Sequence, residues 1–158
     1  MNLRRIEPKD QIDILRIYFN SINSIDNKYY TKKKKFAWCS QAWMNVNFRK
    51  TLLKGKGWII EDNFRKIGFT IRYPKNKLSL FYCKGNSQKK GYGTKLLEKI
   101  EEDAFAENIL LLETEASLIS YKLLIKKGWQ ISYKEEVVIN NEDFIRYKMT
   151  KNLKNYCS

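Results

Sequence analysis

The spacing of apolar residues divides the chain into helical and extended segments. Residues 10–25 carry apolar side chains three and four positions apart, which predicts an amphipathic helix. Its apolar face consists of Ile14, Ile17, Tyr18 and Ile22, widened by Leu15 and Phe19. Residues 91–108 repeat the pattern, with an apolar face of Leu96, Leu97, Ile100, Ala104 and Phe105. We therefore expect two long helices, one near the amino terminus and one past the middle of the chain.

Shorter segments fill the remaining positions. The pattern predicts helices over residues 32–38, 46–53 and 117–127, and strands over residues 58–61, 66–73, 78–83, 109–114, 129–139 and 144–150. Asp62-Asn63-Phe64 and Asn140-Asn141 are turn signals between strands, and Gly128 suits a left-handed helix cap. The order of helices, three strands, helix, strand, helix and two strands predicts a mixed α/β domain around one sheet.

Length and composition limit the class of protein. With 158 residues, of which 43% are hydrophobic and 14% aromatic, the chain is expected to form one domain over residues 1–158. Such a composition excludes disorder along the whole chain. The chain has no apolar run of about 18 residues, so no transmembrane helix is expected. The charged stretch Met1–Asp10 differs from a secretory signal, so we expect a cytoplasmic protein without a membrane partner.

The residue types that are missing limit the chemistry. The chain contains no histidine, which excludes Ser-His-Asp and Cys-His catalysis and removes the commonest zinc ligand. Cys39, Cys83 and Cys157 are far apart and odd in number, so neither a disulfide framework nor a metal site is expected. The formal net charge of +14 fits nucleic-acid binding, compositional drift toward lysine, or a site for a polyanionic cofactor. Because the lysines are scattered, drift is preferred and a nucleic-acid partner is not expected.

A turn past the middle of the chain has the features of a phosphate site. Its sequence is Gln88-Lys89-Lys90-Gly91-Tyr92-Gly93-Thr94. The first amides of the following helix have no helical partners and lie at the positive end of the helix dipole, where phosphates bind. Gly91 and Gly93 let an anion approach the backbone. Lys89 and Lys90 add positive charge, and Thr94 adds a hydroxyl. The spacing matches neither the dinucleotide motif nor the P-loop, and a turn capped by glycines is the alternative.

Two motifs resemble those of a known family. The pattern Gln88-x-x-Gly91-x-Gly93 after a strand resembles the acetyl-CoA signature of the GNAT superfamily of N-acetyltransferases. The segment Ala116-Ser117, followed by a helix and Lys127-Gly128-Trp129, resembles the second motif of that family. The order of elements is similar to the family's over nearly the whole chain.

The resemblance implies a fold and a branch. The implied GNAT fold has a mixed, mostly antiparallel sheet flanked by helices, with parallel strands at 78–83 and 109–115 that splay apart. The spacing from Tyr30 to Trp38 and the ending Arg146-Tyr147-Lys148-Met149 resemble a YafP-like bacterial branch.

The resemblance also implies acetyl-CoA as cosubstrate, with no metal. The amides from Lys89 to Thr94 would hold the pyrophosphate, and the end of the preceding strand would pair with the pantetheine arm. The implied cofactor-binding residues are Phe81, Tyr82, Cys83, Gln88, Lys89, Lys90, Gly91, Tyr92, Gly93 and Thr94. The implied activity is direct acetyl transfer to an amine of a small molecule or a protein, by a monomer or a homodimer. An acetyl-CoA-binding module without turnover is the alternative.

The catalytic groups are less clear from the sequence. Many family members carry a tyrosine that acts as general acid at the position of Leu124. Tyr121, one helical turn earlier, is the candidate replacement, with packing as the alternative. Glu113 and Glu115 share a strand face, and Glu115 is the candidate base because burial is expected to raise its pKa. The alternatives are a surface carboxylate that balances lysines, and a bound water as base. Cys83 suggests an acetyl-cysteine intermediate, but without a histidine base direct transfer is preferred.

An aromatic cluster is the candidate acceptor pocket. It comprises Tyr29, Tyr30, Phe36 and Trp38. In the family, the connection between the first two helices lines this pocket, so Tyr30 and Trp38 are the candidate substrate-binding residues, with core packing as the alternative. The acceptor itself is not predicted, because a fold does not fix its substrate.

Overall fold

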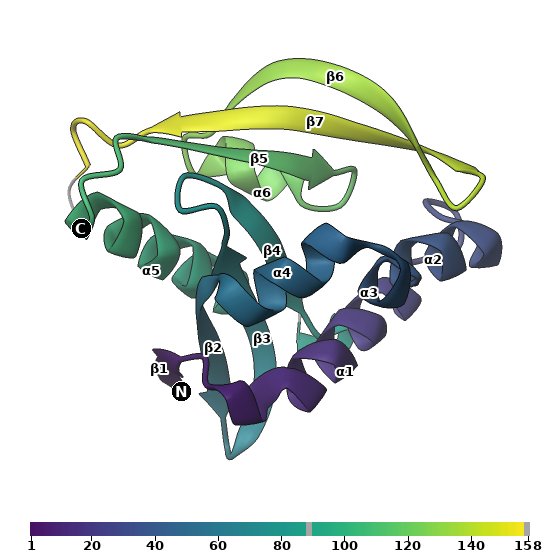
Figure 1. The fold of residues 1–158 in the computed structure, drawn as a ribbon, viewed down its shortest axis with the longest axis horizontal. Coiled ribbons are helices and arrows are strands. Elements are labelled where there is room, and N and C mark those ends of the chain that lie inside the picture. The colour runs from purple at the N-terminus through teal and green to yellow at the C-terminus, as the bar shows by residue number, and fades with distance from the viewer. Residues whose placement is uncertain (88–89, 157–158) are drawn as a thin grey trace.

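Two antiparallel sheets lie side by side in the fold (Figure 1). The structure, a computed structural model, describes residues 1–87 and 90–156. The first sheet has the order β1-β2-β3-β4, formed by Asn2–Arg5, Lys56–Asp62, Arg65–Arg72 and Leu78–Cys83. The second has the order β5-β7-β6, formed by Leu111–Ser117, Glu142–Asn152 and Gln130–Ile139. The two sheets therefore meet along β4 and β5.

Among the described residues, the hydrogen bonds to backbone atoms between the two sheets lie at the start of β4 and within the first four residues of β5. Lys77 and Glu113 form an isolated parallel bridge, and the Glu113 amide donates to the Asn76 carbonyl at 3.0 Å. The buried Thr114 hydroxyl donates to the Leu78 carbonyl at 2.6 Å. Beyond this point, the described residues of β4 pair only with β3, and those of β5 only with β7. The strands therefore splay apart, as expected for these two segments.

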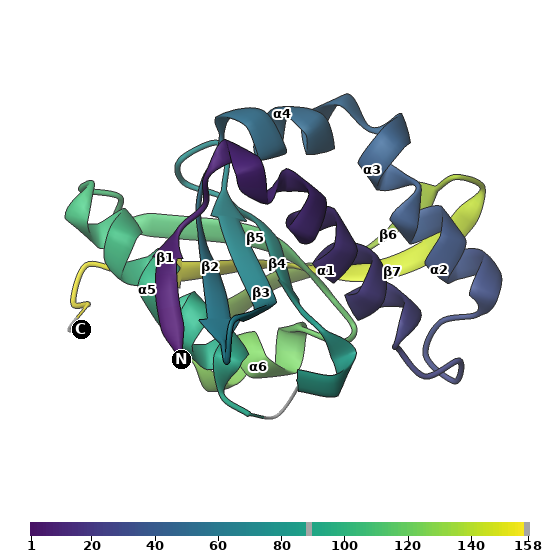
Figure 2. The ribbon, with the colours of Figure 1, turned by 90° about the horizontal axis from the view of Figure 1, so that it is seen from below.

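Helices cover both faces of the first sheet (Figure 2). On one side lie α1 and α4, and on the other lies α5. The helices are α1 Gln11–Asn23, α2 Lys32–Cys39, α3 Gln41–Met44, α4 Val46–Lys54, α5 Tyr92–Ala106 and α6 Tyr121–Lys126, and the short 3-10 turns are Pro8–Asp10 and Gly85–Ser87. No helix among the described residues is long and apolar enough to cross a membrane.

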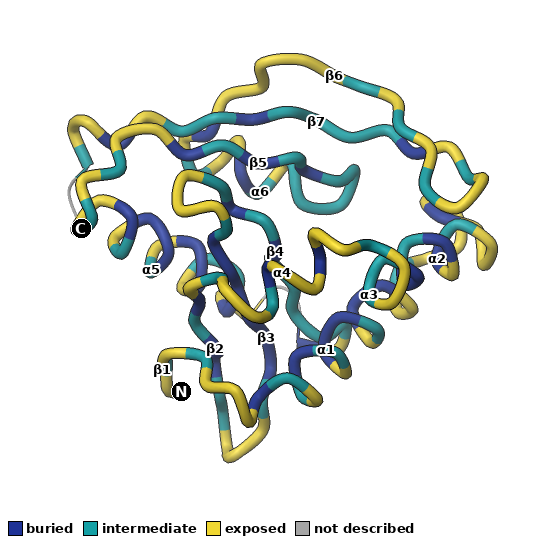
Figure 3. Tube along the Cα trace, viewed as in Figure 1, coloured by how far each residue is buried: buried dark blue, intermediate teal, exposed yellow. Residues whose placement is uncertain are grey.

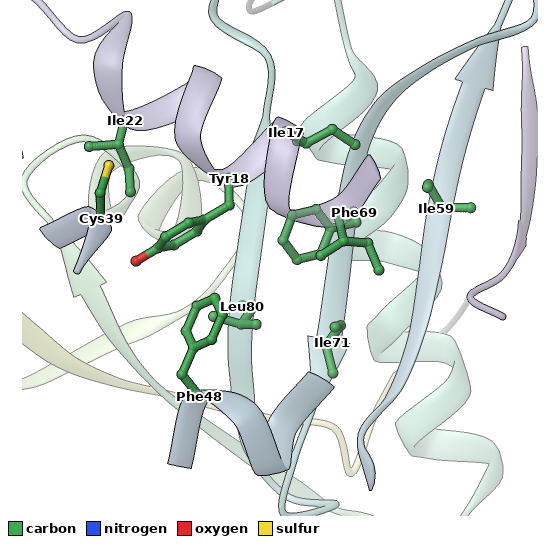
Figure 4. Packing of buried hydrophobic residues seen from close by; sticks show 10 residues of the cluster. Ile17, Tyr18, Ile22, Cys39, Phe48, Ile59, Phe69, Ile71 and Leu80 are labelled. Carbon is green, nitrogen blue, oxygen red and sulfur yellow. The ribbon is translucent and has the colours of Figure 1, made fainter. Parts of the chain in front are cut away.

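Separate apolar clusters hold these layers together. The inner face of α1 packs on β3 and β4, where Tyr18, Phe69 and Leu80 are buried (Figure 4). A second cluster joins α5 to β5, α6 and β7 through Leu97, Leu112 and other buried side chains. Figure 3 shows that the inward faces of α1 and α5 are buried, whereas most of β6 is exposed. The core thus lies between the helices and the two sheets, which leaves the gap between β4 and β5 to be lined by side chains from several elements.

A buried arginine fixes α5 to the first sheet. Arg72 on β3 is 1% exposed, and its guanidinium contacts Asp103 at 3.3 Å and Glu107 at 3.0 Å. Asp103 also binds Arg5 at 2.6 Å, and Glu107 also binds Lys56 at 2.7 Å. The position of α5 is therefore tied to three strands by charge as well as by apolar packing.

The expected turns are confirmed. The β2–β3 turn has left-handed backbone at Asn63 (φ 50°) and Phe64 (φ 63°), and the β6–β7 turn has it at Asn140 and Asn141 (φ 46° and 64°). Gly128, with φ +90°, follows α6 as a left-handed cap.

Several elements differ from the expected ones: α3 was not expected, and β5 covers Leu111–Ser117 where residues 109–114 were expected. The short strand β1 was not expected, and it pairs with β2. The helix expected from residue 117 begins only at Tyr121, because β5 continues to Ser117. The Ser117 hydroxyl accepts from the amides of Ile119 and Ser120, both at 3.2 Å, and these bonds close a turn before the helix.

Candidate active site

The gap between the splayed strands contains a cleft of about 470 Å³. Its wall includes β4, the first turn of α5, the end of β5 and α6. Among its lining residues are Leu78, Phe81, Cys83, Gly91, Gly93, Thr94, Glu115, Ser117 and Leu124. A volume of this size falls within the roughly 300–1,000 Å³ of sites that bind small molecules and cofactors.

The first turn of α5 presents backbone donors to this cleft. Gly91 precedes the helix with φ +83°, and the first helical hydrogen bond that it accepts comes from the Lys95 amide. Within the described residues no side chain caps the turn. The amides of Tyr92, Gly93 and Thr94 are thus oriented as in an anion site, at the positive end of a helix of 15 residues.

The two glycines of the turn differ in backbone conformation and in the space around them. At Gly91 the left-handed backbone favours glycine, although an added Cβ would meet nothing within 4 Å. At Gly93 an added Cβ would lie 3.4 Å from the Phe81 ring and 3.5 Å from Leu123. These are close but tolerable contacts, so protein packing alone does not require glycine at 93. The absence of a side chain at Gly93 leaves room for a ligand to approach the backbone there.

The other predicted residues of the turn are placed differently. Lys90 is exposed, and Gln88 and Lys89 lie outside the described residues. The Tyr92 side chain points back into the protein, where its hydroxyl donates to Asp62 at 2.5 Å and its ring packs in the core. Tyr92 therefore offers only its backbone to the cleft, while its side chain anchors the turn to the β2–β3 hairpin.

The end of β4 divides its side chains between two faces. Phe81 and Cys83 pack toward α5, whereas Tyr82 packs toward α1 against Tyr18 and Phe69, with ring centroids 4.9 and 5.8 Å away. Burial raises the pKa of the Cys83 thiol to about 12, so this sulfur stays protonated at neutral pH. Cys83 therefore lines the cleft as an apolar neutral group.

A second cleft of about 240 Å³ lies on the other side of the junction. It is lined by residues of α1 to α4 and of β4 to β7. Five residues line both clefts: Trp38, Ser79, Tyr82, Glu115 and Ser117. The two clefts therefore meet beside the ends of the splayed strands.

The expected aromatic cluster separates into two groups. Tyr30 and Trp38 line the second cleft, with ring centroids 5.3 Å apart, and the Trp38 indole donates to the Tyr82 hydroxyl at 3.2 Å. Tyr30 is also a core residue, since it is 3% exposed and its hydroxyl accepts from the Leu118 amide at 3.3 Å. Tyr29 and Phe36 are 53% and 61% exposed and do not belong to this lining.

Glu115 lies at the junction, but its environment differs from the expected one. Lys77 binds both carboxylate oxygens, at 2.8 and 3.0 Å, and Lys148 lies 3.8 Å away. Burial acts to raise the pKa of Glu115, but the hydrogen bond from Lys77 and the charges of Lys77, Lys148 and Arg146 outweigh it and lower the pKa. The expectation of a raised pKa is therefore wrong. Glu113 shares this strand face, as expected, and binds Lys148 at 3.4 Å.

The position of the missing tyrosine is apolar. Leu124 is 3% exposed and lines the first cleft. Tyr121 is not among the described residues that line either cleft, and its ring stacks on Tyr147 with centroids 4.4 Å apart. The structure thus gives Tyr121 a packing role and does not bring its hydroxyl to the cleft.

Several lining residues were missed in the sequence. Ser117 lies on the strand face of Glu113 and Glu115, so the alternation along β5 could have revealed it. Lys77 and Arg146 reach the second cleft from elements distant in sequence, and no local pattern indicates them. No group of three or more His, Cys, Asp or Glu side chains suited to a metal occurs in the part of the chain that the structure describes.

Several solved structures share this fold. The GCN5-related N-acetyltransferase of Rhodopseudomonas palustris has 25% sequence identity and a TM-score of 0.88, over 96% of this chain and 95% of that one. The PaiA N-acetyltransferase of Thermoplasma acidophilum, in complex with coenzyme A, has 14% identity and a TM-score of 0.72, over 96% and 99%. YncA of Salmonella typhimurium, a putative acetyltransferase with its cofactor acetyl-CoA, has 16% identity and a TM-score of 0.69, over 100% and 96%.

Sequence comparison gives the same family. No curated protein matches this chain significantly. The sequence model of the acetyltransferase (GNAT) family matches residues 19–124, which include the turn before α5, all of β5 and much of α6. Because this match spans well over half of the 158 residues and the fold agrees, the chain belongs to the GNAT family of acetyltransferases.

Proposed function

We propose that this protein transfers an acetyl group from acetyl-CoA directly to an amine. One observation carries the proposal. The uncapped first turn of α5 lies at one side of the first cleft, and this cleft meets the second one beside Glu115. One cleft suits a long phosphate-bearing cosubstrate, and the other suits an acceptor. The coenzyme A and acetyl-CoA complexes of similar folds support this use of the first cleft.

Each part of the first cleft has a role in this proposal. The amides of Tyr92, Gly93 and Thr94 bind the pyrophosphate, and Lys90 adds charge at the exposed rim. The free edge at the end of β4 pairs with the pantetheine arm, along Phe81 to Cys83. When bound, acetyl-CoA supplies an activated thioester at the junction of the clefts.

Direct transfer needs little acid–base chemistry from the chain. The amine nitrogen forms a bond to the acetyl carbon and the carbon–sulfur bond breaks, so coenzyme A leaves as a thiolate, which takes up through water the proton that the attacking nitrogen sheds. To reach the neutral amine, the acceptor ammonium first gives one proton to water. Glu115, with its lowered pKa, is a weak base, and we assign it to holding the acceptor ammonium before that proton is lost. Cys83 is protonated and does not take the acetyl group. Positioning of the two reactants supplies much of the rate.

Acetyl-CoA turnover with a panel of primary amines tests this function. Free thiol release is measured with the full chain, and binding of acetyl-CoA is followed by the melting temperature. At a concentration of about 100 times Kd, binding adds about 2.7 kcal/mol of stability. A melting shift without turnover of any amine would support a sensing module, which the leucine at position 124 favours. No melting shift at saturating acetyl-CoA would contradict both functions.

Two finer assignments stay predictions. The YafP-like branch rests on the Tyr30-to-Trp38 spacing and on Arg146-Tyr147-Lys148-Met149. A single domain over residues 1–158 is tested by limited proteolysis, which should yield no stable fragment.

A further inference from the structure

The second cleft contains a guanidinium that is only partly used. Arg146 on β7 lines the cleft, and its Nε donates to Glu135 at 2.5 Å. Its two terminal nitrogens have no hydrogen-bond partner within residues 1–87 and 90–156. The side chain is 37% exposed, so an incoming ligand can reach it. A guanidinium edge with two parallel donors matches a carboxylate.

The sheet register places this guanidinium near Glu115. Ser117 lies opposite Arg146, and Glu115 lies opposite Lys148, so all four side chains share one face of the sheet. Arg146 and Glu115 are therefore diagonal neighbours, within reach of one another for long side chains. One molecule can contact both when it carries a cation and an anion a few bonds apart.

The charges of the lining favour that kind of molecule. The charged lining residues of the second cleft are Lys77, Glu115 and Arg146. Lys77 is paired with Glu115, and Glu135, the partner of the Arg146 Nε, does not line the cleft, so the charge of the lining residues themselves is positive and centred on Arg146. A polyamine would bring a second ammonium toward Arg146 and be repelled, whereas a carboxylate there would be attracted.

The rest of the wall is aromatic. Trp38, Tyr82, Tyr30, Phe48 and Phe144 all line the cleft, and Tyr30 lies 5.9 Å from Phe144 between ring centroids. Such rings bind apolar and aromatic side chains. The volume of about 240 Å³ is below that of drug-sized sites, which indicates a small acceptor.

We propose that the acceptor is a small amino acid-like zwitterion with an aromatic or other apolar side chain. Its carboxylate binds the terminal nitrogens of Arg146, its amino group lies at Glu115 beside the first cleft, and its side chain packs on the aromatic wall. The proposal rests on the proposed function for its use of the second cleft as the acceptor site.

Matched pairs of compounds test the role of the carboxylate. L-phenylalanine is compared with 2-phenylethylamine, and L-tryptophan with tryptamine, since each pair differs by the carboxylate alone. Binding to the protein saturated with coenzyme A is measured by isothermal titration calorimetry, and acetylation is then measured with acetyl-CoA. We expect the amino acids to bind at least about tenfold more tightly than their decarboxylated partners, as a charge-assisted bidentate contact provides.

The variant Arg146→Gln should abolish this difference. Amino-acid affinity should fall at least about tenfold, amine affinity should change little, and the melting temperature and acetyl-CoA affinity should stay near those of the wild type. Arg16→Gln removes the same charge from an exposed site on α1 and should leave the difference intact.

The possible failures are distinct. Equal binding of acids and amines by the wild type, or an undiminished preference for acids in Arg146→Gln, would overturn the inference. Arg146-dependent binding without acetyl transfer would uphold the site for amino acids while contradicting the proposed transferase function. Acetylation of amines but not of amino acids would uphold the function and overturn the inference.

Discussion

At the scale of single residues, two side chains of the cleft have their protonation set in opposite directions by their neighbours. Glu115 is held ionised because Lys77 and other cations outweigh the effect of burial. Cys83 is held neutral because burial acts on it without a compensating cation, and its pKa rises to about 12. Neither group therefore changes its charge around neutral pH, and each gives a distinct prediction.

Glu115→Gln should weaken acceptor binding more than it slows the chemical step. A carboxylate with a lowered pKa is a weak base, so we expect KM for the amine to rise about tenfold through loss of a charge-assisted contact, with kcat nearly unchanged. The rise of kcat/KM with pH should be the same in wild type and variant, because it reports the acceptor amine. Steady-state kinetics from about pH 6 to about pH 9 measure both effects.

Glu113→Gln is the control on the same strand face, since Glu113 lines neither cleft in the described structure. A loss of about 10²–10⁴ in kcat for Glu115→Gln, with a shifted pH profile, would instead identify Glu115 as the base.

Cys83→Ala should retain most of the activity. The thiol is protonated at working pH and lacks a partner base among the described residues, so its removal deletes only a contact in the cleft wall. Thiol release and mass spectrometry of the protein during turnover provide the measurement. Complete inactivity, together with an acetylated wild-type protein trapped on this cysteine, would contradict direct transfer.

Gly93→Ala should weaken acetyl-CoA binding without loss of stability. The added methyl group makes only near-van der Waals contacts with Phe81 and Leu123, but it projects where the cosubstrate must approach the backbone. We expect Kd for acetyl-CoA, measured by calorimetry, to rise at least about tenfold, with an unchanged or slightly higher melting temperature.

Gly128→Ala is the matched control. Its φ of +90° should make the substitution cost about 1–2 kcal/mol, while acetyl-CoA affinity stays unchanged. An unchanged affinity in Gly93→Ala would place the phosphates elsewhere.

At the scale of elements, the placement of α5 matters most, because its first turn is the candidate phosphate site. Arg72 holds this helix through Asp103, in its last turn, and Glu107, the residue that caps it. Burial acts to raise the pKa of Asp103, but Arg5 and Arg72 together lower it. The pKa of Glu107 is also lowered, chiefly by its hydrogen bond to Lys56 and also by Arg72. We call the ion pairs of Arg72 with Asp103 and Glu107 the clamp. It holds α5 only while these two carboxylates are ionised.

Arg72→Met should destabilise the protein by about 3 kcal/mol, because it removes a buried guanidinium from two partly buried carboxylates. Arg16→Met, on an exposed helix face, should change stability by less than about 0.5 kcal/mol. Urea unfolding measures both. Because the folded pKa values are lowered, the clamp contributes fully above the unfolded values of about 4 and is lost as pH falls through the folded ones. The gap between wild type and Arg72→Met should therefore narrow toward pH 3, and a gap independent of pH would contradict the clamp.

Elements with a long periodic pattern could be predicted from the sequence, and short ones could not. The helices at 11–23 and 92–106 were predicted within two residues, because apolar positions repeat through several turns. Asn2–Arg5 has no such repeat, and it becomes a strand only through pairing with β2. The boundary of α6 depends on hydrogen bonds of Ser117, which compete with the helix locally.

In the candidate site too, features set by local spacing could be predicted, and features set by contacts distant in sequence could not. The glycine turn and the face of Glu113 and Glu115 follow from local spacing, so the sequence located them. The pKa of Glu115 depends on Lys77, 38 residues away, and the second cleft depends on Arg146. Lys77 is brought to Glu115 by the contact of β4 with β5, and Arg146 by the pairing of β5 with β7, and no local pattern encodes either.

At the scale of the whole molecule, the net charge of +14 should act on a cosubstrate with several phosphates. We expect the affinity for acetyl-CoA to fall several-fold as KCl is raised from about 0.1 M to about 1 M, where the screening length shortens from about 10 Å to about 3 Å. Acetyl-pantetheine, which lacks phosphates, should show little change. Calorimetry of both ligands measures the difference, and equal salt dependence would mean that the charge does not serve the cosubstrate.

The sharing of only five residues between the two clefts has a kinetic consequence. Residues of α5 and α6 line only the first cleft, and residues of α3, α4, β6 and β7 line only the second, so we expect occupancy of one cleft to leave access to the other open. Either reactant can then arrive first, and both must be present before the acetyl group moves. Initial rates measured at several fixed concentrations of each reactant should give intersecting lines in a double-reciprocal plot, and coenzyme A should compete with acetyl-CoA but not with the acceptor.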